Sequence, residues 1–320
     1  MSSISKGDFI DVYLKLKVKG VKYLLSKFKF IPKNRIASKW DNYESVSDFW
    51  VIPEITDKWN EIISGNPKVI YEDYVYEKYL KGKSNLKLLS VGCGEGYHDR
   101  NFAKYDCFES VLGMDYSPES IRVAKEKAQE KNYDVTYECG DFYEREFTEK
   151  YDVILFSSSL HHFDKIDFFL ENKIKPLLND NGILVIFEYI GPNRLQWRKS
   201  QLKRSNELLK QMPLKYRIYY DGATIKNKVY KPGYLRMLMV DPSEAIDSEA
   251  ILPALHKHFK ILEEKKLGWN ILHLLLKGIA HNFLNDESQT KEIITDLIAK
   301  EYGFVEEEGS SDAIFGVYSL

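Results

Sequence analysis

The strongest constraint on the fold is a regular alternation of short β-rich runs with helix-like stretches, which begins at Leu86. This alternation predicts βαβ units, and therefore a largely parallel sheet with helices on both faces. Ser117 and Pro118 supply an N-cap and a proline at the first helical position, which marks the start of one helix. The predicted strands are 86–92, 110–115, 134–139, 151–157, 182–189, 260–267 and 313–318, and the predicted helices are near 98–105, 118–131 and 164–178.

The composition is that of a folded chain without a disulfide framework. Its 320 residues are 44% hydrophobic and 29% charged, with a formal net charge of −2, which excludes an overall polycation built for nucleic acid. Three cysteines lack the spacing of a zinc site and favour a reducing compartment, so we expect a cytoplasmic protein. The first eleven residues do not resemble a signal peptide, and no apolar run approaches the 18 residues of a membrane span.

The chain divides into an extension, residues 1–80, and a main domain, residues 81–320. We expect the extension to be mainly helical, basic and aromatic. Between Val12 and Lys39 it has nine basic residues and no acidic one, which predicts a solvated helix or, alternatively, a peripheral contact with anionic lipid. Its aromatic segment, Trp40–Trp59, is expected to pack or to wall a substrate pocket. The main domain carries two predicted insertions, a basic and tyrosine-rich one at 193–240 and a helical one at 270–308.

A glycine-rich loop follows the first strand, at Gly92-Cys93-Gly94-Glu95-Gly96. Three glycines at alternate positions allow a tight turn and a close approach of a ligand to the backbone. Asp115 stands twenty-one residues beyond Gly94, at the end of the next strand. In this topology its carboxylate is expected beside the loop, within reach of a ribose diol.

The spacing of the glycines separates two classes of cofactor. A dinucleotide site has G-x-G-x-x-G before a helix that faces a pyrophosphate, whereas this loop has G-x-G-x-G. Glu95 would repel a pyrophosphate but suits the positive charge of S-adenosylmethionine. Asp141, within Gly140-Asp141-Phe142 after the third strand, is expected to accept from an adenine amino group, or else only to form a turn. Tyr116, Phe142 and Ser157 complete the predicted cofactor residues.

Four of these segments resemble, in order and spacing, the motifs of class I S-adenosylmethionine-dependent methyltransferases. They are Val91–Gly96, Gly113–Pro118, Gly140-Asp141 and Tyr151–Ile154. The resemblance implies an α/β, Rossmann-like, seven-stranded sheet whose last strand is antiparallel. A looser resemblance of 188–197 and 241–249 to methyltransferases of bacterial sugar and surface-glycan synthesis implies a role in polysaccharide biosynthesis. Asp241-Pro242-Ser243-Glu244 predicts a capped helix that runs to about Phe259.

Candidate catalytic residues follow the fourth and fifth strands. His161 and His162 come after one, Glu188 ends the other, and the two strands are expected to be neighbours. A histidine can remove the proton of an acceptor hydroxyl while a carboxylate orients its ring or acts as the base itself. His162 is slightly favoured as the base. A divalent metal held by the same three residues is the alternative.

The basic insertion predicts an anionic acceptor. Residues 193–240 carry twelve basic and two acidic side chains, although the whole chain is slightly acidic. Arginine forks bind phosphate oxygens and tyrosines stack on bases or sugars, as a nucleotide-diphosphate sugar would require. A solvated helix with a structural loop is the alternative. The predicted substrate residues are Tyr189, Asn193, Arg194, Arg217, Tyr220 and Arg236.

The leading hypothesis is therefore an enzyme that methylates a hydroxyl of a sugar. A nucleic-acid acceptor is less favoured, because Ser157–Leu160 occupies the place of the Asn/Asp-Pro-Pro-Tyr motif of amino-methylating enzymes. A non-catalytic partner with this fold, and a dehydrogenase, are weaker alternatives. We expect a small-molecule substrate and no nucleic-acid partner, and an oligomer could form through the extension or the helical insertion.

Overall fold

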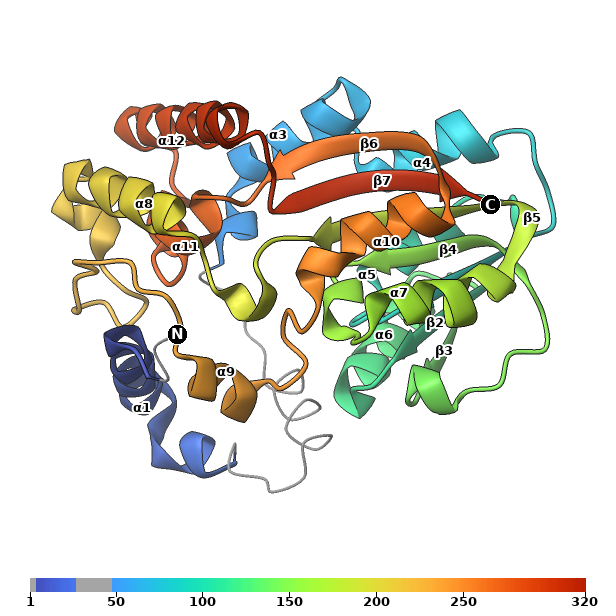
Figure 1. The fold of residues 1–320 in the computed structure, drawn as a ribbon, viewed down its shortest axis with the longest axis horizontal. Coiled ribbons are helices and arrows are strands. Elements are labelled where there is room, and N and C mark those ends of the chain that lie inside the picture. The colour runs from blue at the N-terminus through green and yellow to red at the C-terminus, as the bar shows by residue number, and fades with distance from the viewer. Residues whose placement is uncertain (1–3, 27–47) are drawn as a thin grey trace.

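A seven-stranded mixed sheet forms the centre of the molecule (Figure 1). The structure, a computed structural model, describes residues 4–26 and 48–320. The strand order is β3-β2-β1-β4-β5-β7-β6. All pairings from β3 through β5 are parallel, and β7 is antiparallel to both β5 and β6, which confirms the predicted topology. The strands are β1 (Leu86–Val91), β2 (Phe108–Asp115), β3 (Thr136–Cys139), β4 (Tyr151–Ser157), β5 (Leu178–Tyr189), β6 (Lys260–Gly268) and β7 (Ala313–Ser319).

Helices cover both faces of the sheet. Alternate residues of a strand point to opposite faces, so Leu155 of β4 packs in one core and Ile154 in the other. The first core also contains α3 (Pro53–Ser64), α4 (Tyr71–Val75) and α5 (Tyr97–Ala103), whereas α7 (Ile166–Phe169) and α10 (Ile251–His258) belong to the second. The remaining helices are α1 (Lys6–Ser26), α6 (Pro118–Glu130), α8 (Lys199–Gln211), α9 (Tyr234–Val240), α11 (Leu272–Leu276) and α12 (Ser288–Glu308).

The predicted cap of α6 is present. The helix predicted to start at Asp241 starts later, although it ends at His258, close to the predicted end at Phe259. Ser117 Oγ accepts a hydrogen bond from Ser120 N at 3.1 Å, and Pro118 begins the helix. Asp241 Oδ1 does accept from Ser243 N at 3.0 Å, yet Ala245 adopts a left-handed conformation with φ 46°. That conformation breaks the helical path, so 241–247 form a loop and α10 begins only at Ile251.

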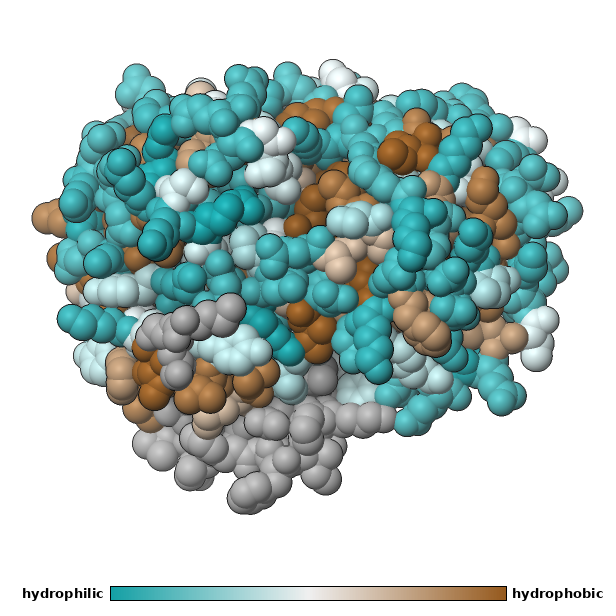
Figure 2. All heavy atoms as spheres, viewed as in Figure 1, coloured by the Kyte–Doolittle hydropathy of each residue, from teal (hydrophilic) through white to brown (hydrophobic). Residues whose placement is uncertain are grey.

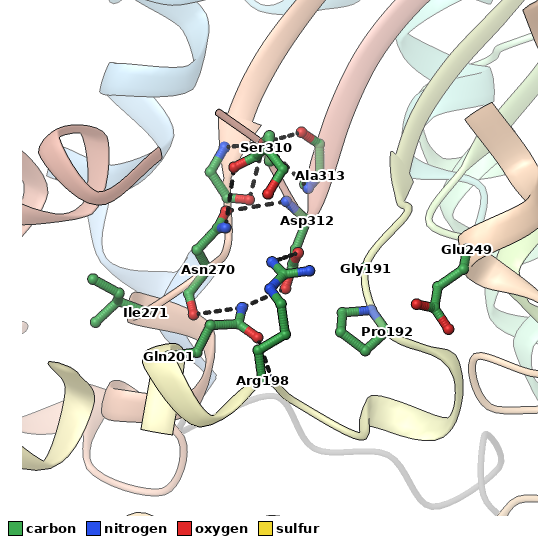
Figure 3. A network of polar contacts seen from close by, with 12 residues as sticks. Gly191, Pro192, Arg198, Gln201, Glu249, Asn270, Ile271, Ser310, Asp312 and Ala313 are labelled. Atoms are coloured by element: carbon green, nitrogen blue, oxygen red, sulfur yellow. Dashed lines mark hydrogen bonds and ion pairs between the residues drawn. The ribbon is translucent and has the colours of Figure 1, made fainter. Parts of the chain in front are cut away.

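The two insertions lie beyond the carboxyl ends of the parallel strands, where α8, α11 and α12 gather (Figure 1). A buried polar network fastens α8 to β7 (Figure 3). Asp312 accepts from Arg198 Nη2 at 2.6 Å through one oxygen and from Gln201 Nε2 at 2.6 Å through the other. Asn270 joins the network because its Oδ1 accepts from Asp312 N at 3.0 Å and its backbone oxygen from Gln201 Nε2 at 3.0 Å. The position of the basic insertion is therefore set by the antiparallel edge of the sheet.

The helix α1 packs against the same insertion. Asp8 Oδ1 accepts from Gly233 N at 3.1 Å, Arg236 pairs with Asp11, and Lys17 pairs with Asp221 at 2.6 Å. Apolar side chains gather over α1 and α9 on this face (Figure 2). Lys15 pairs with Asp11 within α1, at 2.9 Å. The other seven of the nine basic residues lie where side chains are not described, from 19 to 39. Within the described ranges, no helix is long and apolar enough to cross a membrane.

Candidate active site

A cavity of about 1970 Å³ lies between the carboxyl ends of the parallel strands, the basic insertion and α1. Ligands of open α/β sheets bind at this edge. Every predicted cofactor residue lines the cavity except Gly96, which packs against Tyr137. The cavity-lining members of that set are Gly92, Cys93, Gly94, Glu95, Asp115, Tyr116, Gly140, Asp141, Phe142 and Ser157.

The glycine loop between β1 and α5 has a left-handed backbone at all three glycines, and two of them leave no room for a side chain. Gly92, Gly94 and Gly96 have φ values of 72°, 55° and 70°. A Cβ at Gly92 would lie 2.5 Å from Ser159 Cβ, and one at Gly96 would lie 2.1 Å from the Tyr137 hydroxyl. At Gly94, by contrast, a Cβ would meet nothing within 4 Å. Because Gly94 also lines the cavity, a ligand can approach its backbone closely.

Two carboxylates lie beside this loop. Asp115 Oδ2 accepts from Gly94 N at 2.8 Å, and its Oδ1 accepts from Ser117 N at 2.8 Å. A carboxylate has about four lone-pair sites, so binding these two amides is compatible with a hydrogen bond from a ribose hydroxyl to Asp115. Asp141 Oδ1 accepts from Tyr143 N at 3.0 Å, so it forms the turn considered above and lines the cavity as well.

Glu95 lines the cavity, but its negative charge is partly balanced by a neighbouring lysine. Its carboxylate pairs with Lys127 of α6, so this part of the electrostatic argument for a cationic cofactor is weaker in the structure than in the sequence. A further carboxylate, Asp99, is fully buried in the first turn of α5, and the sequence reasoning missed it. Burial raises the pKa of Asp99 to about 6. A Cβ at Gly113 of β2 would lie 2.8 Å from Asp99 Oδ2, so glycine is needed there too.

Glu188 and His161 form a buried dyad at the ends of β5 and β4. Glu188 is completely buried, and its Oε2 accepts from Ser159 N at 2.8 Å and from Leu160 N at 2.6 Å. Its Oε1 accepts from Tyr189 N at 2.8 Å and is bonded to His161 Nδ1. His161 lines the cavity, whereas Glu188 lies behind it. Glu188 therefore orients His161 and does not face a substrate.

His162 is held by a different segment, the loop that begins at Asp241. Its Nδ1 is 3.1 Å from Ser243 Oγ, and Ser243 Oγ donates to Asp241 Oδ1 at 2.6 Å. Glu244 of the same loop approaches the other ring, with Oε1 3.7 Å from His161 Nε2. The potential ligand atoms of His161, His162 and Glu244 all lie within 4.8 Å of one another. Glu244 therefore replaces Glu188 in the candidate set of metal ligands, because the Glu188 oxygens already bind backbone amides and His161.

The predicted substrate residues divide into two groups. Tyr189, Tyr220 and Arg236 line the cavity, although Arg236 pairs with Asp11. Asn193, Arg194 and Arg217 do not line it, so the structure does not bring them to the substrate as the sequence reasoning expected. Asn193 Oδ1 accepts from Glu249 N, Arg194 Nη1 donates to Pro242 O, and Arg217 Nε donates to Lys226 O. These side chains hold loops together.

An aromatic wall completes the cavity. Trp50 and Trp59, from the predicted aromatic segment, line it together with Trp197 and Trp269, which the sequence reasoning did not assign. His273 stands among these rings, 5.8 Å from the Trp197 centroid and 6.0 Å from that of Trp269, and burial lowers its pKa to about 3. No local pattern marks Trp197 and Trp269, because they come together only when the two insertions fold.

The donors and acceptors around the loop fit a nucleoside with a short charged tail. The loop backbone is open at Gly94, Asp115 can accept from a diol, and Asp141 and Phe142 flank the position expected for a base. The spacing is too short for the pyrophosphate of a dinucleotide. Fold and site together define a class I S-adenosylmethionine-dependent methyltransferase domain.

Comparison with known families agrees with this class. Residues 82–248 match the family model described as "Methyltransferase domain", which covers just over half of the chain. The chain therefore belongs to the methyltransferase-domain family.

The curated relatives are O-methyltransferases, but their names do not refer to the polysaccharide biosynthesis expected from the sequence. The chain is 29% identical over 153 residues to the ubiquinone biosynthesis O-methyltransferase of Pelagibacter ubique (strain HTCC1062), covering 46% of this chain and 62% of that protein. It is 26% identical over 136 residues to the malonyl-[acyl-carrier protein] O-methyltransferase of Acetivibrio thermocellus, covering 42% and 47%. The match spans less than two thirds of each relative. These relatives give no support to the looser resemblance to sugar and glycan enzymes.

Solved structures of similar topology include two that are matched over most of this chain. One is the O-methyltransferase from the trans-AT PKS multienzyme of Brevibacillus brevis in complex with S-adenosyl-L-homocysteine, with 12% identity, a TM-score of 0.48, and coverage of 87% of this chain and 80% of that one. Another is the [4+2]-cyclase SpnF, with 14% identity, a TM-score of 0.45, and coverage of 85% and 94%.

Proposed function

We propose that this protein transfers a methyl group from S-adenosylmethionine to a hydroxyl of a small molecule, with His161 as the general base. One observation carries the proposal: the His161–Glu188 dyad faces the same cavity as the glycine loop. Glu188 accepts from Nδ1–H of His161, so the basic lone pair of the ring is on Nε2. His161 is thus a better candidate for the base than His162, which the sequence slightly favoured.

The chain's own residues would orient the reaction and handle its proton. S-adenosylmethionine, when bound, supplies the methyl group on its sulfonium sulfur. Gly92, Gly94 and Asp115 would hold the nucleoside end of the cofactor, and the aromatic wall would exclude water from the acceptor. His161 Nε2 would take the acceptor's hydroxyl proton, and Glu188 would stabilise the imidazolium that results. Such a base contributes about 10²–10⁴-fold to the rate.

The wall of the cavity supports an acceptor with a large apolar or aromatic part. Four tryptophans line it, and His273 among them is neutral because burial has lowered its pKa. A flat ring that carries the hydroxyl would stack on such a surface.

A nucleotide sugar is the second candidate acceptor, and the basic insertion supports it. Lys228 and Lys231 of this insertion, and Lys277 of the helical insertion, line the cavity and could attract an anionic group. The arginine forks do not add to this support, because Arg194 and Arg217 are bound to backbone oxygens outside the cavity. We favour the apolar acceptor for that reason. The three free cysteines, Cys93, Cys107 and Cys139, support a reducing, cytoplasmic location for either reaction.

Two measurements test the proposal in sequence. Isothermal titration should detect S-adenosylmethionine binding, and the absence of heat at millimolar-range cofactor would contradict the assignment. Purified enzyme should then be incubated with cofactor and with two acceptor panels, hydroxylated aromatic compounds and nucleotide sugars. Mass spectrometry should show the gain of one methylene unit in the aromatic panel. A gain only in the sugar panel would reverse the order of the two acceptors.

A further inference from the structure

Three side chains with metal-binding atoms converge in the cavity: His161, His162 and Glu244. Their potential ligand atoms lie within 4.8 Å of one another, and His161 Nε2 is 3.7 Å from Glu244 Oε1. The two imidazole centroids are 4.2 Å apart. A zinc–nitrogen bond is about 2.0–2.1 Å long, so ligands around one ion lie roughly 3–4 Å apart. A small contraction would bring all three onto one ion.

The hydrogen bonds of both histidines place the ring proton on the same nitrogen, Nδ1. Glu188 Oε1 is an acceptor, so His161 carries its proton on Nδ1. Ser243 Oγ donates its own proton to Asp241, so it must accept from Nδ1–H of His162. Both rings therefore carry their lone pair on Nε2, the atom type that binds a metal ion. A carboxylate or hydroxyl behind a ligating histidine is the usual arrangement in metal sites, because it fixes the tautomer and the orientation of the ring.

The loop that carries the third residue, Glu244, is fixed by hydrogen bonds with two other segments. Ile246 N donates to His161 O at 3.2 Å, which joins this loop directly to the histidine segment. Arg194 N donates to Ala245 O at 2.6 Å, and its Nη1 donates to Pro242 O at 2.5 Å. Arg194, which does not reach the cavity, thus braces both sides of Glu244.

We propose that His161, His162 and Glu244 form a binding site for a divalent transition-metal ion. Two imidazoles and one carboxylate suit zinc, cobalt or ferrous iron better than magnesium or calcium, which prefer oxygen ligands. The catalytic meaning of the site rests on the proposed function. With the ion bound, His161 is a ligand and no longer the base. The ion would bind the acceptor hydroxyl and lower its pKa, and the proton would pass to water. The oxygen would then form its bond to the methyl carbon as the carbon–sulfur bond breaks and its electron pair stays on sulfur.

The chain offers a natural control for this site. Asp167, Glu171 and His258 form the other cluster of potential ligands in the described ranges, but its two carboxylates are exposed and none of the three lines the cavity. Lys257 pairs with Asp167 at 2.8 Å, which already neutralises part of that cluster. We expect no tight binding there.

The test is a titration of the full chain with cobalt ions after treatment with a chelator, followed by visible absorption. The wild-type protein and Asp167→Asn should bind one ion per chain with the same affinity and the same spectrum. Glu244→Gln should weaken binding by more than about tenfold, and Ser243→Ala, which removes the support of His162, by roughly 10–100-fold. Circular dichroism checks that each variant is folded.

Two results would overturn the inference: no cobalt spectrum in the wild-type protein, or a spectrum that Asp167→Asn abolishes and Glu244→Gln leaves intact. A parallel titration with S-adenosylmethionine distinguishes failure of the metal-site proposal from failure of the proposed function. If the cofactor binds and methyl transfer proceeds after chelation at the metal-replete rate, His161 is the base and the catalytic role of the ion is rejected. If metal binds but the cofactor does not, the proposed function fails and the site stands.

Discussion

The two sides of the cavity are built in different ways. On the cofactor side the site is formed by the backbone of a loop with three left-handed glycines and by two carboxylates, each in the short segment where a strand ends. On the acceptor side, side chains form it, through aromatic rings and ion pairs that join α1, the basic insertion and the helical insertion. The difference teaches that a site made by the backbone leaves a local signature in the sequence, whereas a site made by side chains from distant segments does not.

The largest expected effect separates chemistry from cofactor binding. His161→Gln should lower turnover by about 10²–10⁴-fold, because the group that removes or holds the acceptor proton is lost. The affinity for S-adenosylmethionine, measured by calorimetry, should be unchanged, because the hydrogen bond from Gly94 N to Asp115 holds the glycine loop without the His161 side chain. Full turnover in this variant would show that the dyad does not take part in catalysis.

The next effect tests whether the cofactor side depends on its backbone. Gly96→Ala places a methyl group 2.1 Å from the Tyr137 hydroxyl at a φ of 70°. It should weaken cofactor binding and lower the free energy of unfolding by about 1–3 kcal/mol, as measured with urea. Gly82→Ala is the matched control, since Gly82 has a φ of 82° but open space around it. Equal losses in both variants would mean that strain alone, and not the contact with Tyr137, is responsible.

A pH-dependent effect is expected from Asp99. Burial raises its pKa to about 6 from an ordinary value of 3.8. Between these values the folded protein holds a proton that the unfolded chain has lost, so this stabilising contribution is complete below about pH 4 and is lost as the pH rises through 6. Asp99→Asn should therefore be more stable than the wild type at pH 8, by up to about 3 kcal/mol, with the difference shrinking towards pH 4.

Urea unfolding at several pH values measures this effect. Asp106→Asn, at an exposed carboxyl, controls for the loss of one negative charge. A constant difference between wild type and Asp99→Asn across the range would show that Asp99 is ionised even when buried.

The smallest effect tests the acceptor side. Arg217→Met should leave the KM for the acceptor unchanged, because Arg217 donates to Lys226 O and Asn227 Oδ1 outside the cavity. Lys277→Met should raise the KM for an acceptor with an anionic group, because Lys277 lines the cavity. Steady-state kinetics of the two variants compare them directly. A raised KM in Arg217→Met alone would restore the original prediction for that arginine.

The sequence predicted the sheet well because strands and helices alternate with a clear period. All seven strands, the antiparallel β7 and the cap at Ser117 are present, and the glycine loop lies where its spacing placed it. The failure at Asp241 has a physical cause. The local pattern of a capped helix was real, but the left-handed Ala245 ends it, and the loop is held by Arg194 and His161 from elsewhere in the chain.

The acceptor side could not be predicted to the same depth. Basic residues of the insertion look alike in sequence, whether they face a ligand or a carbonyl oxygen. Arg194 is bound to the loop of Glu244, while Lys228 lines the cavity, and only the fold distinguishes them. Glu244 was visible in the sequence only as a helix-capping acid, and its approach to His161 depends on a contact between segments about eighty residues apart.

The contact between Arg198 and Asp312 has a consequence for biosynthesis. Its two partners are separated by 114 positions. During synthesis on the ribosome, 114 further residues must therefore be added after Arg198 before the Asp312 carboxylate is present to bind its guanidinium. The strands β1 to β4 pair with one another and with β5, which ends at Tyr189. All these partners precede Asp312, so this part of the sheet can fold before the insertions are fixed around the cavity.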